Sequence, residues 1–192
     1  MRLVLQRVHD ASVRVGDAEV SRIGRGLVAL VGLGPDDTEA DLIWCVDRIA
    51  TTALWPEHVG ATEEGKAWHN SVASAGLDVL CVSQFTLFAT LKRKKGGLTF
   101  HNAMAPTPAR VVYADFLAKV RAALPQCAVR DGEFGARMNV NLTNDGPVTL
   151  TLDSRSGNGL VPINGPTLAP TAGAAHAPPP RPTRALAAST NR

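Results

Sequence analysis

Three hydrogen-bonding side chains follow an apolar run in the middle of the chain. Ser83, Gln84 and Thr86, with Phe85 among them, come directly after residues 77–82, which have the composition of a buried strand. Hydroxyl and amide groups at a strand end that faces a pocket can orient the carbonyl or hydroxyl group of a ligand. The same residue types also favour a local turn, in which Ser83 and Thr86 bond to nearby backbone. On residue type alone, the turn is the better supported interpretation.

A second polar segment, Asn144-Asp145-Gly146-Pro147-Val148-Thr149, lies between two stretches of alternating apolar residues. Asn-Asp-Gly predicts a hairpin turn and by itself indicates no function. Pro147, however, cannot donate to a sheet ladder, and a Gly-Pro bond adopts the cis form more readily than most peptide bonds do. A cis Gly146–Pro147 peptide would direct two adjacent carbonyl groups roughly the same way, as a rigid pair of acceptors. Residues 164–166 repeat Asn-Gly-Pro without flanking strands.

The usual signatures of catalysis are absent from the sequence. It has no G-x-S-x-G elbow, no H-E-x-x-H motif, no phosphate-binding loop and no dinucleotide-binding glycine pattern. A triad of Ser83 with His101 would need an acid that only the fold could place. No pair of histidines has the spacing of metal ligands, which argues against a metal hydrolase. We expect no cofactor. The histidines are His9, His58, His69, His101 and His176.

A compact basic stretch, Lys92-Arg93-Lys94-Lys95, precedes two glycines. Four consecutive cations beside a glycine pair suit contacts with RNA phosphates. A solvated surface loop explains the stretch equally well, because runs of like charge are commonly just exposed.

The elements that would position these groups alternate between strands and helices. Apolar and β-branched patterns predict strands at 2–8, 12–15, 27–33, 77–82, 138–142 and 148–152. Asp36-Asp37-Thr38 would cap a helix whose apolar positions run from Leu42 to Ala50. Thr107-Pro108 would open a second helix that ends at Pro125. These elements predict a mixed α/β domain with two helices on one side of a sheet.

Length and composition allow one domain with an extension. The chain has 192 residues, of which 45% are hydrophobic, enough for one domain of ordinary size. Residues 1–153 carry a net charge of −1, whereas residues 154–192 hold four arginines, seven of the 13 prolines and no acidic residue. That composition predicts an extended or flexible tail without a core of its own. Its arginines could contact RNA, but a solvated extension is the simpler interpretation.

Targeting and cysteine patterns favour a cytoplasmic protein. The longest apolar run, residues 26–33, is far shorter than the roughly 20 residues of a membrane-spanning helix. The first 16 residues mix charged and apolar side chains, unlike a secretory signal, so we expect the mature protein to start here, in a reducing compartment. Cys45, Cys81 and Cys127 are odd in number and far apart, which favours small buried side chains over disulfides.

Four short motifs occur in a fixed order between residues 1 and 153. They are Leu5-Gln6-Arg7-Val8, Val82-Ser83-Gln84-Phe85-Thr86-Leu87, Phe134-Gly135-Ala136-Arg137-Met138-Asn139-Val140 and Asn144-Asp145-Gly146-Pro147-Val148-Thr149. In this order and spacing they resemble the D-aminoacyl-tRNA deacylase family, and residues 154–192 have no counterpart. The resemblance implies a sheet in barrel-like layers with two helices packed on one side. It also implies a metal-free homodimer that hydrolyses the ester between a D-amino acid, or glycine, and the terminal adenosine of tRNA.

The resemblance also implies roles for individual residues. The strand end at residues 83–86 would line the catalytic pocket. The pair Gly146 and Pro147 would be cis, would enter the pocket of the partner subunit and would exclude L-amino acids. Arg7 would brace this pair, and Phe134 and Met138 would contact the terminal adenosine.

The chemistry of such a substrate fits the absence of a triad. An aminoacyl ester is already activated, and the neighbouring 2′-hydroxyl can help to activate water, so the protein need supply mainly positioning and donors for the oxyanion. Backbone amides near Phe85 and Thr86 are candidate donors. Thr86 as a covalent nucleophile is the competing mechanism, but the sequence shows no adjacent base. We therefore favour substrate-assisted hydrolysis.

Two other functions stay open on the sequence. A related deacylase that removes L-alanine from mischarged tRNA would need a wider pocket and a differently set Gly-Pro pair. A non-catalytic RNA-binding module would use residues 92–95 and the arginines of the tail. The intact Ser-Gln-Phe-Thr and Asn-Asp-Gly-Pro-Val-Thr strings favour the D-specific enzyme.

Overall fold

The computed structural model describes residues 1–60, 65–92 and 96–156, and these belong to one compact unit. The predicted tail from residue 157 onward and the basic residues 93–95 lie outside the described residues. The elements are β1 (Arg2–Val15), β2 (Ala18–Ile23), β3 (Gly26–Gly32), α1 (Glu39–Thr51), α2 (Val72–Ala75), β4 (Asp78–Ser83), the 3-10 helix η1 (Phe85–Phe88), β5 (Thr90–Leu91), β6 (Leu98–Thr99), α3 (Pro106–Ala123), β7 (Val129–Asp131) and β8 (Asn139–Asp153).

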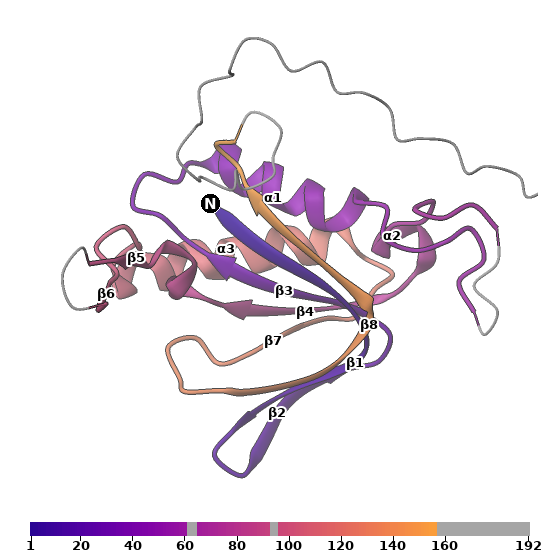
Figure 1. Cartoon of the computed structure of the whole chain (residues 1–192), viewed down its shortest axis with the longest axis horizontal. Coiled ribbons are helices and arrows are strands. Elements are labelled where there is room, and N and C mark those ends of the chain that lie inside the picture. Colours follow the sequence, from indigo (N-terminus) through magenta and orange to yellow (C-terminus); the bar gives the residue numbers. More distant parts are fainter. Residues whose placement is uncertain (61–64, 93–95, 157–192) are drawn as a thin grey trace, which may run out of the picture. The chain divides into compact units, whose positions relative to one another are not determined.

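A six-stranded mixed sheet forms the centre of the fold (Figure 1). Its order is β2-β1-β3-β4-β7, and β8 also pairs with β1. The first half of β1 pairs with β3 and the second half with β2, while β8 pairs with both halves. β4 lies parallel to both β3 and β7. The sheet curls into nearly closed, barrel-like layers, and the expected fold class is confirmed. The short α2 and η1 were not predicted.

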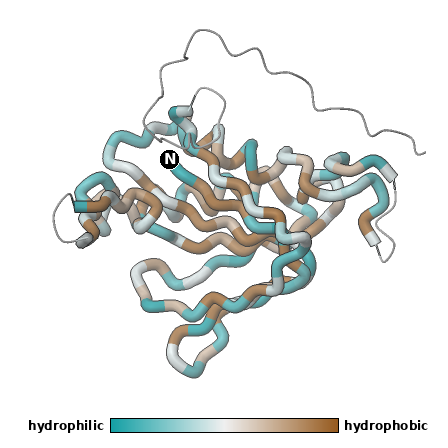
Figure 2. Tube along the Cα trace, in the orientation of Figure 1, coloured by the Kyte–Doolittle hydropathy of each residue, from teal (hydrophilic) through white to brown (hydrophobic). Residues whose placement is uncertain are grey.

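Successive residues of the central strands point into two different cores. Leu27, Ala29 and Cys81 pack against the cluster that includes the buried faces of α1 and α3. Val28 and Leu80 face a second cluster, formed with residues of β1, β2 and β8. Because β3 and β4 are buried on both faces, their sequences read as unbroken apolar runs rather than as alternating patterns. Figure 2 shows these hydrophobic strands in brown at the centre of the fold.

The two long helices lie side by side on one face of the sheet (Figure 1). Thr38 is the N-cap of α1, as predicted, and the Asp41 carboxylate accepts hydrogen bonds from the Thr38 backbone N–H (2.8 Å) and hydroxyl (2.7 Å). The predicted start of the second helix is wrong: α3 begins at Pro106, with Ala105 as N-cap. Proline suits this first turn because its backbone lacks the N–H that a helix start leaves without a partner. No helix among the described residues is long and apolar enough to span a membrane.

The hairpin predicted at residues 144–147 does not form. β8 runs unbroken from Asn139 to Asp153, and both predicted strands pair with the continuous β1, which also joins the predicted strands 2–8 and 12–15. The register changes from Gln6↔Thr149 to Val8↔Asn144, so residues 145–148 bulge out opposite Arg7 alone. The Gly146–Pro147 peptide at this bulge is cis. Because β1 is long enough to pair with β8 on both sides of residues 145–148, these residues form a bulge and not a hairpin turn.

The expectation of buried cysteine side chains holds for two of the three, because Cys127 is only half-buried. Cys45 and Cys81 are buried, and this burial raises the pKa of each thiol to about 12. Both thiols therefore stay protonated and behave as small apolar core residues.

The start of α1 should make stability depend on acid pH. Burial acts to raise the pKa of Asp41, but hydrogen bonds from Ser154 and Thr38 outweigh it and lower the pKa from 3.8 to about 2. A carboxylate with a depressed pKa stabilises the fold above its unfolded pKa and loses that contribution as the pH falls. In urea unfolding, the stability advantage of the wild type over Asp41→Asn should reach about 1 kcal/mol above pH 4, after allowance for screening by solvent. It should vanish towards pH 2; a constant difference would contradict this origin.

Candidate active site

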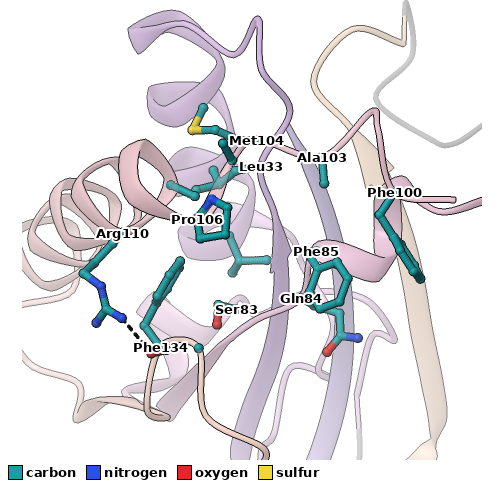
Figure 3. Close-up of a pocket in the computed structure, with 14 residues that line it drawn as sticks. Leu33, Ser83, Gln84, Phe85, Phe100, Ala103, Met104, Pro106, Arg110 and Phe134 are labelled. Atoms are coloured by element: carbon teal, nitrogen blue, oxygen red, sulfur yellow. Dashed lines mark hydrogen bonds between the residues drawn. The ribbon is translucent and has the colours of Figure 1, made fainter.

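A cavity of about 620 Å³ opens where β3 and β4 end (Figure 3). Because β3 and β4 are parallel, their carboxyl ends meet at the same edge of the sheet, which is where open α/β sheets bind ligands. Loops before α3 and after β7 complete the walls. The lining residues are Val31, Leu33, Ser83, Gln84, Phe85, Phe100, Ala103, Met104, Ala105, Pro106, Ala109, Arg110, Phe134 and Gly135.

The polar wall of the cavity is the end of β4. Ser83 is the last residue of the strand, and the Gln84 backbone N–H donates to the Val31 carbonyl at 2.7 Å. The chain then turns into η1 through backbone bonds, the Leu87 N–H donating to the Gln84 carbonyl at 3.3 Å. The local turn weighed from the sequence is thus present, but backbone hydrogen bonds form it. Among the described residues, neither the Ser83 nor the Thr86 side chain bonds to backbone.

Two backbone amides at this turn are available to a ligand. Within the part of the chain that the structure describes, no hydrogen bond is donated by the N–H of Phe85 or of Thr86. The Gln84 side-chain amide donates to the Thr86 hydroxyl oxygen. The Phe85 ring is 58% exposed and packs edge-on against Phe100, with ring centroids 5.0 Å apart. The strand end therefore offers amide and hydroxyl donors beside exposed aromatic surface.

The first strand holds η1 in place. The Arg2 guanidinium donates to the Leu87 carbonyl at 2.8 Å and to Asp153 at 3.0 Å, and it lies 4.6 Å above the centroid of the Phe88 ring. Phe88 packs closely on Gly34, where an added Cβ would approach the ring to 3.0 Å. Because these contacts fix Leu87 and Phe88, they also fix the preceding Phe85 and Thr86.

Phe134, which packs against Tyr113 at a tilted angle, lies on the opposite wall. The ring centroids of Phe134 and Tyr113 are 5.5 Å apart, and the guanidinium of Arg110 lies 5.0 Å from the Phe134 centroid. The Tyr113 hydroxyl donates to Asp131 at 2.8 Å, which ties α3 to β7. Burial raises the pKa of Asp131, although the bond from Tyr113 opposes that rise. Phe134 is thus supported from α3 at the mouth of the cavity.

Arg7 and Asp145 form a buried ion pair beside the bulge of β8. Arg7 is 9% exposed and Asp145 5% exposed. The Arg7 guanidinium donates to the Asp145 carboxylate at 3.0 Å, to the Asp145 carbonyl at 3.3 Å and to the Leu54 carbonyl at 2.6 Å. Arg25 adds a contact to the same carboxylate at 3.3 Å. This pair fixes the residue that directly precedes Gly146.

The backbone at Gly146 accepts only glycine without distortion. Its φ is +115°, and an added Cβ would lie 2.8 Å from Cγ2 and 3.0 Å from the backbone nitrogen of Val148. Both Gly146 and Pro147 are exposed in the single chain. The bulge therefore presents a shaped stretch of backbone to its surroundings.

The strand register places this bulge beside the amino-terminal ends of β3 and β4, whereas the cavity lies at their carboxyl ends. Arg7 pairs with Leu27, and Leu27 pairs with Val79, four residues before Ser83. A strand advances about 3.3 Å per residue. Gly146 and Pro147 consequently cannot reach the cavity that contains Ser83 in their own chain.

The structure thus brings together only some of the residues singled out from the sequence. Ser83, Gln84, Phe85 and Phe134 line one cavity, with Thr86 beside it. Arg7, Gly146 and Pro147 form the separate cluster around the bulge. Met138 lines neither, because it packs against the second core and its sulfur accepts the Glu133 N–H at 3.3 Å.

The sequence also raised the possibilities of a triad with His101 and of a metal site. His101 bonds to Thr99 at 3.0 Å, and no bond joins it to Ser83 among the described residues. Those residues also hold no cluster of three or more possible metal ligands.

Sequence reasoning missed Phe100, Met104 and Arg110 as lining residues. Phe100 and Met104 lie in a loop and Arg110 near the start of a helix, where apolar periodicity gives no information. The only available signal was the occurrence of an aromatic residue, a methionine and an arginine close together in the sequence before and at the helix start.

Fold and cavity define an α/β protein with a cavity at the carboxyl ends of two parallel strands. Residues 4–153 match the family described as D-Tyr-tRNA(Tyr) deacylase. The chain belongs to this family of hydrolases, as the four motifs indicated. It is 46% identical over 157 residues to the D-aminoacyl-tRNA deacylase of Yarrowia lipolytica, a match that covers 81% of this chain and 99% of the relative. It is 41% identical over 154 residues to D-aminoacyl-tRNA deacylase 1 of Danio rerio, a match that covers 80% of this chain and 71% of the relative.

Two solved structures are similar to this fold. The structure titled c-Myc DNA Unwinding Element Binding Protein is 41% identical, with a TM-score of 0.73, and the match covers 81% of this chain and all of that chain. A probable eukaryotic D-amino acid tRNA deacylase has a TM-score of 0.66 at 21% identity, over 79% of this chain and 97% of that one. The second likeness shows the fold alone.

Proposed function

We propose that this chain hydrolyses the ester bond between a D-amino acid and the terminal adenosine of tRNA. The observation that carries the proposal is the strand end Ser83-Gln84-Phe85, which opens into the cavity with donors on one wall and aromatic rings on the other. The names of the relatives, D-aminoacyl-tRNA deacylase, support this substrate class. The homodimer, the cytoplasmic location and the activity on glycyl-tRNA belong to the same proposal.

The site chemistry supports attack by water rather than by a side chain. Thr86 receives a hydrogen bond from the Gln84 amide, and an amide is not a base that could activate its hydroxyl. The N–H groups of Phe85 and Thr86 donate to no acceptor in the described part of the chain, so they can donate to the developing oxyanion. The 2′-hydroxyl of the terminal ribose lies next to the ester and can orient the water. Under this proposal the protein contributes positioning and oxyanion donors, and the substrate contributes the activated ester.

A second subunit would complete the site. Gly146 and Pro147 are exposed and far from their own cavity, whereas Arg7 and Asp145 hold the bulge from within. A shaped, exposed piece of backbone with a buried brace is suited to enter another molecule. We therefore assign Gly146 and Pro147 to the cavity of the partner in a homodimer.

The proposed arrangement explains the choice of enantiomer. If the carbonyl groups of Gly146 and Pro147 hold the α-ammonium, the two enantiomers exchange the places of the Cα hydrogen and the side chain. The side chain of an L-amino acid would then collide with backbone, whereas glycine and D-amino acids would fit. Rejection of the wrong substrate by collision tolerates many D side chains.

Incubation with three substrates tests the proposal. We expect the purified protein to release D-tyrosine from D-Tyr-tRNA and to leave L-Tyr-tRNA intact, measured as loss of acid-precipitable radiolabelled amino acid. Release of L-alanine from mischarged L-Ala-tRNA, without action on the D substrate, would favour the related L-alanine deacylase. Binding of tRNA without release of any amino acid would indicate a non-catalytic module.

A further inference from the structure

Arg110 is the one charged side chain among the described residues that line the cavity. It stands in the second turn of α3, at the mouth of the cavity, and its side chain is exposed. The described ranges hold no ion pair for it. A cation that has no ion-pair partner among the described residues, at the mouth of a mainly apolar cavity, can bind an anion from outside.

The geometry of Arg110 is that of an ordered binding group. Its guanidinium lies over the Phe134 ring, 5.0 Å from the centroid, and donates one long hydrogen bond, 3.4 Å, to the Phe134 carbonyl. A guanidinium has five N–H donors in a fixed plane, so most of them remain free. Stacking on an aromatic ring holds that plane and reduces the entropy lost when a planar anion-binding contact forms.

The proposed substrate carries one anion near its reactive end. We propose that Arg110 binds the 5′-phosphate of the terminal nucleotide; this inference rests on the proposed function. The α-ammonium of the amino acid would be repelled by Arg110 and must lie at the other side of the cavity. Figure 3 shows Arg110 beside Phe134, on the opposite side of the view from Gln84 and Phe85.

With the phosphate at Arg110 and the α-ammonium at the other side of the cavity, the substrate could bind in only one orientation. Arginine matches phosphate geometry with paired N–H donors. A nucleoside base can stack on accessible aromatic rings, and the exposed Phe85 and the half-buried Phe134 offer such rings on the two walls. With the phosphate held by Arg110, the ester is directed towards Ser83 and the free amides of Phe85 and Thr86.

A pair of substrates that differ by one phosphate tests the assignment. The substrates are 3′-O-(D-tyrosyl)-adenosine and its 5′-phosphate, and the variant is Arg110→Gln. We expect the variant to raise the KM of the phosphorylated substrate about tenfold and to leave its kcat nearly unchanged. The KM of the unphosphorylated substrate should not change. Equal losses on both substrates would mean that Arg110 only supports Phe134, and no loss on either would also overturn the assignment.

A binding measurement separates this inference from the proposed function, because it needs no catalysis. In NMR titrations of the wild type, adenosine 5′-monophosphate should bind about tenfold more tightly than adenosine, and Arg110→Gln should abolish the difference. If the wild type hydrolyses no ester but keeps this preference, the proposed function fails and the phosphate site stands. Equal binding of the two ligands by the wild type would overturn the site.

Two further variants control for charge and for geometry. Arg22→Gln removes one cation on β2, where Arg22 pairs with Glu19 at 2.6 Å, and should leave the phosphate preference intact. Arg110→Lys keeps the charge, and its KM for the phosphorylated substrate should lie between those of the wild type and Arg110→Gln.

With full-length tRNA, Arg110→Gln should reduce the slope of log KM against log salt concentration by about 0.7, the value for one single-stranded phosphate contact. An unchanged slope would count against the contact.

Discussion

Replacement of Arg7 by methionine should lower the free energy of unfolding by about 3–5 kcal/mol and reduce deacylation at least about a hundredfold. Methionine keeps the apolar stem of the side chain but leaves the buried carboxylate and carbonyl of Asp145, and the carbonyl of Leu54, without their main donor. The contact of Arg25 with the Asp145 carboxylate at 3.3 Å and that of His9 at 3.8 Å remain, but neither of these two distances is as short as the 3.0 Å from Arg7. Urea unfolding and D-Tyr-tRNA hydrolysis measure the two effects.

The activity loss has a separate physical reason from the stability loss. Asp145 precedes Gly146, so a shift of the Asp145 backbone moves the exposed pair Gly146 and Pro147 directly. Arg7→Lys keeps the charge but cannot reach three acceptors at once, and should recover only part of both losses. Arg22→Met, a change at an exposed pair, should leave stability and activity nearly unchanged. Stability of Arg7→Met close to that of the wild type would disprove the brace.

Substitution of Gly146 by alanine should reduce hydrolysis of D-Tyr-tRNA about a hundredfold while the protein remains folded. The added Cβ would lie 2.8 Å from Cγ2 and 3.0 Å from the backbone nitrogen of Val148, and alanine disfavours a φ of +115°. The backbone must move to relieve these contacts, and it moves at the residues assigned to the partner's cavity. Because the bulge is exposed, the expected cost in unfolding free energy is only about 1–3 kcal/mol.

A matched glycine separates the steric effect from the cost of the dihedral angle. Gly16 also has a positive φ, +56°, but an added Cβ there would meet nothing within 4 Å. Gly16→Ala should therefore lose a little stability and keep full activity. If Gly146→Ala hydrolyses D-Tyr-tRNA as fast as Gly16→Ala does, the bulge does not take part in the reaction.

Local sequence signals identified the elements whose formation depends on local physics. The unbroken apolar runs of β3 and β4 and the cap of α1 at Thr38 were predicted correctly, because burial on both faces and capping leave direct marks in the sequence. The start of α3 was misplaced because Thr107 resembles a better cap than Ala105, which makes no side-chain cap bond. The start of α3 therefore depends on the path of the preceding loop and not on a side-chain cap.

Long-range pairing overruled the strongest turn signal. Asn144-Asp145-Gly146 favours a hairpin locally, but β1 offers one continuous partner to residues on both sides of it. A ladder along the whole of β1 satisfies more backbone groups than a hairpin of two short strands would. The same segment therefore became a bulge, and its polar residues gained a buried arginine partner that the sequence alone did not predict as an ion pair.

The amino-acid sequence by itself determined the family, the mixed α/β class and the polar strand end at residues 83–86, because motifs and apolar periodicity are written in neighbouring residues. Only the tertiary structure decided that Phe100, Met104, Arg110 and Phe134 share one cavity with that strand end, and that the Gly146–Pro147 bulge lies beside the opposite ends of β3 and β4. Those relations depend on strand register and on where loops end in space. Contacts between residues far apart in the chain are set by the packing of whole elements, which no short stretch of sequence encodes.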